Sequence, residues 1–285
     1  MNRQDSRLTP VSLTLACLAI GCGQDTVIQI PAPSSVTGAP EAKFKETRAS
    51  AVEHVAGKAL VVETVNGSIE VRAQERADVE IVSHLKATTE ERLKAVTIVT
   101  SRSADGTRNV NAEWPDGKRI GSESCAFEIL IPDVDGLTLR SSNGKQQAQG
   151  FTGTANLRTS NGSIELINHK GAMELKSSHG TVEARDVHGP VKANTSNGPI
   201  KVRLTSDSEA PVELVTSNGG ITLNVGPAFA GKLDISTSNG GIDTSGLQNA
   251  RLLTSERRNV KLQIGESMTQ SRIKTSNGSI NVKSC

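Results

Sequence analysis

The carboxylates of this 285-residue chain are the first side chains to test for chemistry. Hydrolysis of a glycosidic bond needs two carboxyl groups that face each other across a groove, usually beside aromatic side chains that hold the sugar rings. The chain has no Tyr, one Trp and four Phe. The carboxylates of its second half are scattered, and several lie beside Lys or Arg: Glu165, Glu174, Glu183, Glu213 and Asp243. We therefore predict no catalytic residue and no cofactor.

Histidines are the next candidates, because imidazole is a common metal ligand. His169 and His188 are separated by nearly one unit of the repeat described below, so they would occupy almost equivalent corners and could stack. No third ligand of the right kind accompanies them. Calcium-binding β-roll repeats carry Asp at fixed positions, whereas the corners of this chain carry Asn and Ser. We predict no metal site.

Cys22 is the residue with the clearest covalent chemistry. It follows a short apolar run, Val11 to Ile20, which is preceded by Arg3 and Arg7 and is too short to span a bilayer. Small residues just before a Cys resemble the bacterial lipobox, which implies cleavage before Cys22 and its lipidation. An earlier rival, Cys17, would leave a shorter apolar run. Gly23, rather than Asp, follows the lipidated position, which favours sorting to the outer membrane in a Gram-negative cell.

A recurring Ser-Asn-Gly tripeptide organises the rest of the chain. The steps between its glycines from Gly144 onward are 18, 18, 18, 21, 21 and 38, counting one substituted copy at Gly180. A degenerate copy at Ser255 to Arg257 divides the last step, and Asn66-Gly67 is an isolated early copy. A fixed period of this size predicts a solenoid. The predicted turn residues are Asn143, Gly144, Asn161, Gly162, Gly180, Asn197, Gly198, Asn218, Gly219, Asn239, Gly240, Asn277 and Gly278.

Each unit reads as two short strands joined by two corners. In the unit from Gly171 to His188, apolar and polar residues alternate on both sides of Ser178-His179-Gly180. Glycine takes a positive φ without steric cost and Asn tolerates it, which suits a corner. We predict an all-β parallel β-solenoid of coils of 18 to 21 residues, with an Asn ladder along one corner. An antiparallel meander remains the alternative, because Asn-Gly is also a hairpin signal.

The chain divides into four predicted parts. Residues 1–21 form a lipoprotein signal peptide, 22–45 a flexible Pro-containing tether, 46–135 an N-terminal β-rich cap, and 136–285 the solenoid repeats. A capping-box spacing from Thr88 to Glu91 predicts one short helix in the cap. No cap is evident after the last coil. Cys125 and Cys285 would lie about seven coil steps apart, roughly 35 Å, which argues against a disulfide between them.

Charge excludes one class of partner. The net charge is +2, so the chain has no electrostatic footprint for nucleic acid.

Several stretches resemble one known family. They are Leu60 to Val71, the Phe-Glu-Ile-Leu-Ile-Pro run from Phe127 to Pro132, Leu137 to Leu139, and the repeated Thr-Ser-Asn-Gly-x-Ile. Together they resemble the bacterial putative-adhesin domain of unknown function, a β-strand-repeat family of the cell envelope, over roughly Lys58 to Val282. The resemblance implies an extracytoplasmic β-solenoid, often tethered, for which adhesion is proposed. It carries no catalytic residues to transfer.

These observations predict a non-enzymatic, exported protein, lipid-anchored to the cell envelope at the outer membrane, which serves for binding or scaffolding. Its partners would be the membrane, through the lipid anchor, and a protein or polysaccharide ligand at the surface. Outward rows such as Thr181, Glu183, Lys201, Arg203 and Thr222 would form the contact face. A polysaccharide-active β-helix enzyme and a periplasmic envelope-stress or structural partner protein are the alternatives.

Overall fold

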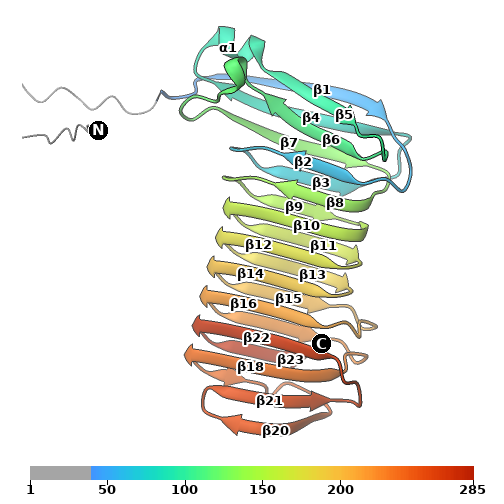
Figure 1. Ribbon diagram of the computed structural model, residues 1–285, viewed down its shortest axis with the longest axis vertical. Coiled ribbons are helices and arrows are strands. Elements are labelled where there is room, and N and C mark those ends of the chain that lie inside the picture. Colours follow the sequence, from blue (N-terminus) through green and yellow to red (C-terminus); the bar gives the residue numbers. More distant parts are fainter. Residues whose placement is uncertain (1–39) are drawn as a thin grey trace, which may run out of the picture. The chain divides into compact units, whose positions relative to one another are not determined.

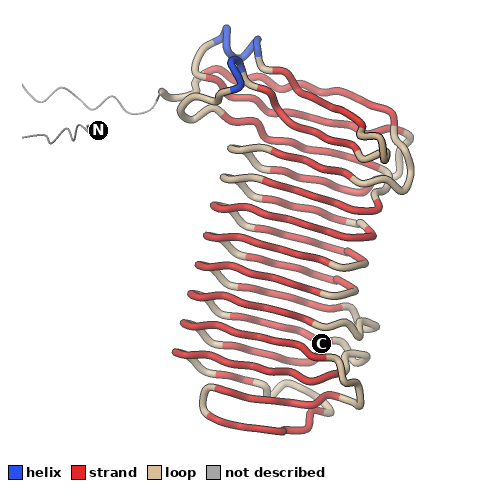
Figure 2. Tube along the Cα trace, in the orientation of Figure 1, coloured by secondary structure: helices blue, strands red, loops and turns tan. Residues whose placement is uncertain are grey.

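The structure is a computed structural model that describes residues 40–285. Cys22 and the predicted signal peptide lie outside the described residues. The 23 strands of the described part form one hydrogen-bonded sheet that winds into a stack with two faces (Figures 1 and 2). Phe44 and Lys45, which we expected at the end of the tether, already belong to the first strand.

We name the two faces by their strands in spatial order. Face A comprises β1 (Phe44–Glu53), β4 (Asp78–Ala87), β7 (Ser124–Ile131), β3 (Ile69–Ala73), β9 (Gln146–Gln149), β11 (Ile164–Lys170), β13 (Val182–His188), β15 (Ile200–Leu204), β17 (Ile221–Val225), β23 (Ile280–Ser284) and β19 (Ile242–Asp243). Face B comprises β5 (Thr97–Arg102), β6 (Arg108–Glu113), β2 (Leu60–Glu63), β8 (Asp135–Arg140), β10 (Thr152–Asn161), β12 (Met173–His179), β14 (Val191–Asn197), β16 (Val212–Asn218), β22 (Gln270–Asn277), β18 (Gly231–Asn239), β21 (Asn259–Ile264) and β20 (Ala250–Glu256).

Parallel, in-register stacking confirms the solenoid and shows that the meander alternative is wrong for the repeats. On face B, Leu157 pairs with Leu175, and Leu175 with Ala193 in the next coil. On face A, Ile164 pairs with Val182, and Val182 with Ile200. All these side chains are fully buried between the faces. The alternation of apolar and polar residues along each strand therefore builds one continuous core.

The Thr-Ser-Asn-Gly corner stacks through two kinds of side-chain hydrogen bond. The Asn side chains donate along the stack, from Asn161 Nδ2 to Asn143 Oδ1 at 2.8 Å and from Asn218 Nδ2 to Asn197 Oδ1 at 2.8 Å. The buried Thr195 hydroxyl donates to the Gly180 carbonyl oxygen of the neighbouring coil at 3.2 Å. Equivalent hydroxyl bonds come from Ser141, Thr159, Ser177, Thr216, Thr237 and Thr275.

Glycine is required at this corner mainly by close approach rather than by a left-handed backbone. Gly144 and Gly278 do have positive φ values, 149° and 157°. Gly162, Gly180, Gly198, Gly219 and Gly240 are outside the range from +20° to +160°, so the positive φ that we expected is wrong for them. A Cβ at each of these five positions would instead overlap the carbonyl oxygen of the corner glycine in the adjacent coil.

The chain order and the spatial order differ at both ends of the stack. The coil β2–β3 lies between β6–β7 and β8–β9, although it precedes both in the sequence. The last coil of the chain, β22–β23, lies between β16–β17 and β18–β19 (Figure 1). The Asn ladder consequently runs from Asn218 to Asn277 and then to Asn239, with donor–acceptor distances of 2.8 Å.

An antiparallel hairpin, β20–β21, closes the C-terminal end on face B. We expected regular coils to run to the end of the chain and no cap after the last one, and both expectations are wrong. The degenerate copy at Ser255 to Arg257 is the end of β20 and the turn that joins it to β21. The hairpin covers the edge of β18 that would otherwise be unpaired.

The N-terminal end is covered by antiparallel strands β1 and β4 and by α1 (Glu90–Ala95). The helix was expected, but its N-cap is Thr89, whose side chain accepts a hydrogen bond from Arg92 N, rather than Thr88. The Thr88 hydroxyl donates instead to the carboxylate of the fully buried Glu123. The same carboxylate accepts a hydrogen bond from Arg92 Nε at 2.8 Å. This buried ion pair fixes α1 to the start of β7.

Candidate binding groove on face B

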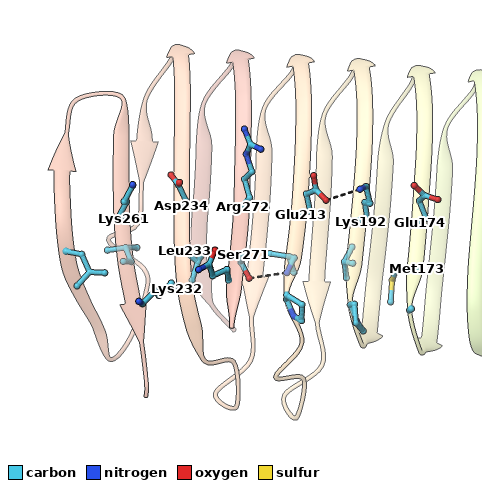
Figure 3. Close-up of a pocket in the computed structure, with 18 of the residues that line it drawn as sticks. Met173, Glu174, Lys192, Glu213, Lys232, Leu233, Asp234, Lys261, Ser271 and Arg272 are labelled. Atoms are coloured by element: carbon cyan, nitrogen blue, oxygen red, sulfur yellow. Dashed lines mark hydrogen bonds and ion pairs between the residues drawn. The ribbon is translucent and has the colours of Figure 1, made fainter. Parts of the chain in front are cut away.

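A groove of about 710 Å³ follows the corner at which the chain enters the strands of face B. It extends across β12, β14, β16, β22, β18 and β21, and reaches Leu253 in β20 (Figure 3). Its lining is largely apolar and includes Ala172, Met173, Pro190, Val191, Pro211, Val212, Leu233 and Leu262. Most of these side chains are buried, and among the apolar lining residues Ala172, Pro190 and Leu253 are exposed.

Two local features shape this groove. Ser271 lies at the inward-facing position that Val212 occupies in the preceding coil of the stack and Leu233 in the following coil. The Ser271 hydroxyl accepts a hydrogen bond from the Val212 N–H at 3.1 Å. A small residue in this column leaves room that Val or Leu would fill. A β-bulge between Leu252 and Thr254 makes Leu253 the extra residue of β20, and Leu253 lines the end of the groove with 48 % of its surface exposed.

Charged side chains of alternating sign run along the groove. In spatial order they are Glu174, Lys192, Glu213, Arg272, Asp234 and Lys261 (Figure 3). Glu213 and Asp234 are neighbouring acids in the order of the repeats, and the alternation arises because β22 places Arg272 between them. The inserted coil thus separates two like charges that direct stacking of β18 on β16 would bring together.

The two halves of this row differ in how far their charges are already paired. Lys192 Nζ lies 3.1 Å from Glu213 Oε2, and Glu174 is in contact with Lys176. The contact with Lys176 lowers the pKa of Glu174. Among the described residues, Arg272, Asp234 and Lys261 form no ion pair. The end of the groove near Leu253 therefore has exposed charges that remain free for a ligand.

The carboxylates considered for catalysis are distributed over both faces. Glu165 and Glu183 are neighbours on face A, where Arg185 contacts both of them. The hydrogen bond from Lys145 lowers the pKa of Glu165, the opposite of what a general acid needs. Glu174 and Glu213 belong to the charge row of face B, and Asp243 lies on β19 of face A, where it bonds to Ser245.

The histidine pair does not assemble. His169 pairs with Val187, and His188 with Lys170, so the two imidazoles are one position out of register. His169 points inward, is buried, and makes a 3.1 Å contact through Nε2 with the Gly153 carbonyl oxygen. Burial lowers its pKa. Within residues 40–285, no group of three or more His, Cys, Asp or Glu side chains is arranged to hold a metal ion.

The two cysteines of the described region are both free. Cys125 is buried at the start of β7, and its burial raises the pKa of the thiol to about 12. Cys285 is exposed at the end of the chain. Neither thiol is part of a disulfide in the described residues.

The predicted contact residues lie on face A rather than at the groove. Glu183, Lys201 and Thr222 are aligned across β13, β15 and β17, and Arg203 pairs with Asn224 one row further along. Thr181 precedes β13 at the Asn corner. The groove was not predicted. The 18- and 21-residue spacing of Glu174, Lys192 and Glu213 was a usable signal, but the place of Arg272 and the bulge at Leu253 depend on pairings that the repeat does not encode.

Within the described residues, no helix is long and apolar enough to cross a membrane.

Stacked parallel coils, an amide ladder and caps at both ends define this protein as a β-solenoid of the all-β class. The chain belongs to the Toastrack family, DUF4097, whose model matches residues 25–283. No curated protein matches the chain.

Two crystal structures are similar to this chain. One is a putative cell adhesion protein from Clostridium sporogenes, with 12 % identity, a TM-score of 0.37, and coverage of 85 % of this chain and 100 % of that one. The other is a putative adhesin from Bacteroides fragilis, with 13 % identity, a TM-score of 0.36, and coverage of 86 % of this chain and 99 % of that one. With TM-scores this low, neither structure bears on what this chain binds.

Proposed function

We propose that this chain is a non-enzymatic protein of the cell envelope, lipid-anchored through Cys22, whose solenoid binds a partner in the groove of face B. The observation that carries the proposal is the groove itself, an apolar surface beside exposed, unpaired charges. The groove is a concave site lined by apolar residues with a few charged groups at its rim, which is the usual character of a ligand-binding site.

The stack supports binding rather than catalysis. Its core is continuous, and its strands hold the groove residues in fixed register over many coils. A rigid surface loses little conformational entropy when a ligand binds. Of the carboxylates at the groove, Glu174 contacts Lys176, which lowers the pKa of Glu174, the opposite of what a general acid needs.

The anchor is tested by replacing Cys22 with Ser and separating membranes from soluble material. The proposal expects the native chain in the membrane fraction and the Cys22→Ser chain in the soluble fraction. Replacing Cys17 with Ser, the rival lipidation position, is the matched control and should leave the chain in the membrane fraction. Continued membrane association of the Cys22→Ser chain would contradict the anchor.

Orientation is tested by adding protease to intact and to lysed cells. Loss of the domain from intact cells supports display at the surface. Degradation only after lysis would place the domain inside the envelope and support the reading as a periplasmic structural or stress-related partner. Both outcomes leave the groove as the binding surface, so the groove needs the separate test described next.

A further inference from the structure

We infer that the groove of face B accepts an extended, proline-rich acidic peptide, and this inference rests on the binding function proposed above. Three cations of the charge row occur at every second strand: Lys192, Arg272 and Lys261. Neighbouring strands are about 4.8 Å apart, so successive cations are separated by about 9.6 Å along the groove. A matching ligand must present negative charges at this interval on one side.

The backbone conformation of the ligand follows from that interval. An α-helix brings side chains to the same side every turn, about 5.4 Å, and a β-strand every second residue, about 6.7 Å. A polyproline II helix has three residues per turn and rises about 3.1 Å per residue, which gives about 9.3 Å per turn. Of these conformations, only polyproline II places every third side chain close to every second strand of face B.

The sign of the ligand's charge follows from the half of the charge row whose side chains form no ion pair. Arg272 and Lys261 form no ion pair within residues 40–285, and the half-exposed Lys232 lines the same part of the groove. Asp234 is the single carboxylate among them in the groove lining. This end of the groove therefore has an excess of positive charge, which favours carboxylates over ammonium groups in a ligand.

The apolar part of the groove indicates which residues of the ligand lie between its charged residues. Pro190, Pro211 and Leu253 lie along the groove beside the charged row, and each is at least partly exposed. Proline rings can cover such a surface, and a polyproline II segment leaves its backbone carbonyls solvated, since it has no internal hydrogen bonds. Because its conformation is largely formed before binding, it loses less entropy than a flexible chain.

The test measures binding of labelled, end-blocked peptides to the full chain by fluorescence anisotropy. The probe is Asp-Pro-Pro-Asp-Pro-Pro-Asp, whose three carboxylates span about 19 Å in polyproline II, as do the four strand steps from Lys192 to Lys261. A peptide of the same composition, Asp-Asp-Asp-Pro-Pro-Pro-Pro, breaks the spacing. A third peptide carries Lys in place of each Asp. We expect the first peptide to bind at least tenfold more tightly than the other two.

Three variants locate the binding. Lys261→Ala, Arg272→Gln and Leu253→Ser each remove one groove contact, and we expect at least a threefold loss of affinity from each. Lys201→Gln on face A removes a cation outside the groove and should leave affinity unchanged. Thermal melting of every variant shows whether the fold is retained. Lys261 and Leu253 are exposed on the terminal hairpin, where substitution is best tolerated.

The outcomes separate this inference from the proposed function. Equal binding of both acidic peptides, or loss of binding with Lys201→Gln, overturns the spacing argument. If polygalacturonate binds and the three groove variants weaken it while no peptide binds, the ligand class is wrong and the groove function stands. If no probe shows binding that depends on groove residues, both the inference and the proposed function of the groove fail.

Discussion

At the scale of single residues, the corner glycines show how little space the stack allows. A Cβ on Gly162 would overlap the Gly144 carbonyl oxygen, and that oxygen also accepts the Thr159 hydroxyl at 3.4 Å. Each coil therefore approaches the next through backbone atoms. Glycine is required here because of packing between coils, and the local sequence of one corner does not show this packing.

Replacing Gly162 with Ala should lower the free energy of unfolding by about 2 kcal/mol or more, because the backbone of two coils must move apart. Gly241→Ala is the matched control, since a Cβ there has no atom within 4 Å. Urea denaturation of both variants measures the difference. Equal stabilities of the two variants would contradict the close approach at Gly162.

Glu123 is the residue whose ionisation matters most to the N-terminal cap. Burial alone would raise the pKa of its carboxyl, but hydrogen bonds from Arg92, the Ile120 and Thr88 amides and the Thr88 hydroxyl outweigh burial and lower the pKa to about 2 from its ordinary 4.5. A folded pKa below the unfolded value means that the stabilisation is present above pH 4.5 and is lost as the pH falls toward 2.

We therefore expect Glu123 to contribute on the order of 3 kcal/mol to stability at neutral pH. The measurement compares urea denaturation of the native chain and Glu123→Gln from pH 7 to pH 2. Because Gln does not titrate, the difference in stability between the two chains should shrink as the pH falls below 4.5. A difference that stays constant over this range would show that the ionised carboxylate is not the stabilising form.

At the scale of elements, we expect the order of the strands to depend on side-chain charge as well as on the repeat. Arg272 of β22 lies between Glu213 of β16 and Asp234 of β18. We expect Arg272→Glu to lower stability by about 1 to 2 kcal/mol at low salt, because two favourable neighbours become repulsive. The effect should weaken in salt, which screens exposed charges.

Lys274→Glu is the control for this charge reversal. Lys274 lies on the same strand, and its neighbours across the sheet, Val215 and Ser236, carry no charge. Salt-dependent denaturation should show a large effect for Arg272→Glu and a small one for Lys274→Glu. Similar losses from both variants would mean that the charge row does not select the position of β22.

The sequence predicts the coil and misses the ends, for a physical reason. Within the regular coils, from Ala155 to Val225, each strand stacks on the coil one repeat away, so period and alternation determine its partners. At the C-terminal end, the repeat alone predicts that Asn239 stacks on Asn218, because both follow the same 21-residue spacing. The pairing that places Asn277 between them joins strands that are far apart in the sequence, and no local pattern shows it.

The groove was missed for the same reason. Its charged wall alternates only in spatial order, and its apolar end depends on a bulge in β20 that places Leu253 in the groove lining. The sequence did predict the Asn ladder and the short helix, because each of these depends on local spacing or on the period of the repeat.

At the scale of the whole molecule, the two ends must prevent edge-to-edge assembly of the stack. The hairpin β20–β21 pairs with the nine-residue strand β18, and its own edge strand β20 carries a bulge. Bulged and short edges discourage pairing with another chain. Removing residues 250–264 should therefore expose a regular β18 edge and the buried Leu233 and Ile235.

We expect this deletion to convert a monodisperse chain into large oligomers, observed by size-exclusion chromatography with light scattering. Replacing the two turn residues, Arg257 and Arg258, with Asn and Gly keeps both strands and is the control, which should preserve the native elution. A deletion variant that stays monodisperse at high concentration would show that the hairpin is not needed to protect the end of the stack.

The central claim is that the groove of face B is the surface through which this protein binds its partner. Site-specific photo-crosslinking in living bacteria that express the full chain tests it most directly, with the photoreactive residue placed at Leu253 in the groove or at Lys201 on face A. We expect one discrete adduct from position 253 that is lost when Arg272→Gln is added, and none from position 201. Adducts from position 201 alone, or from neither position, would contradict it.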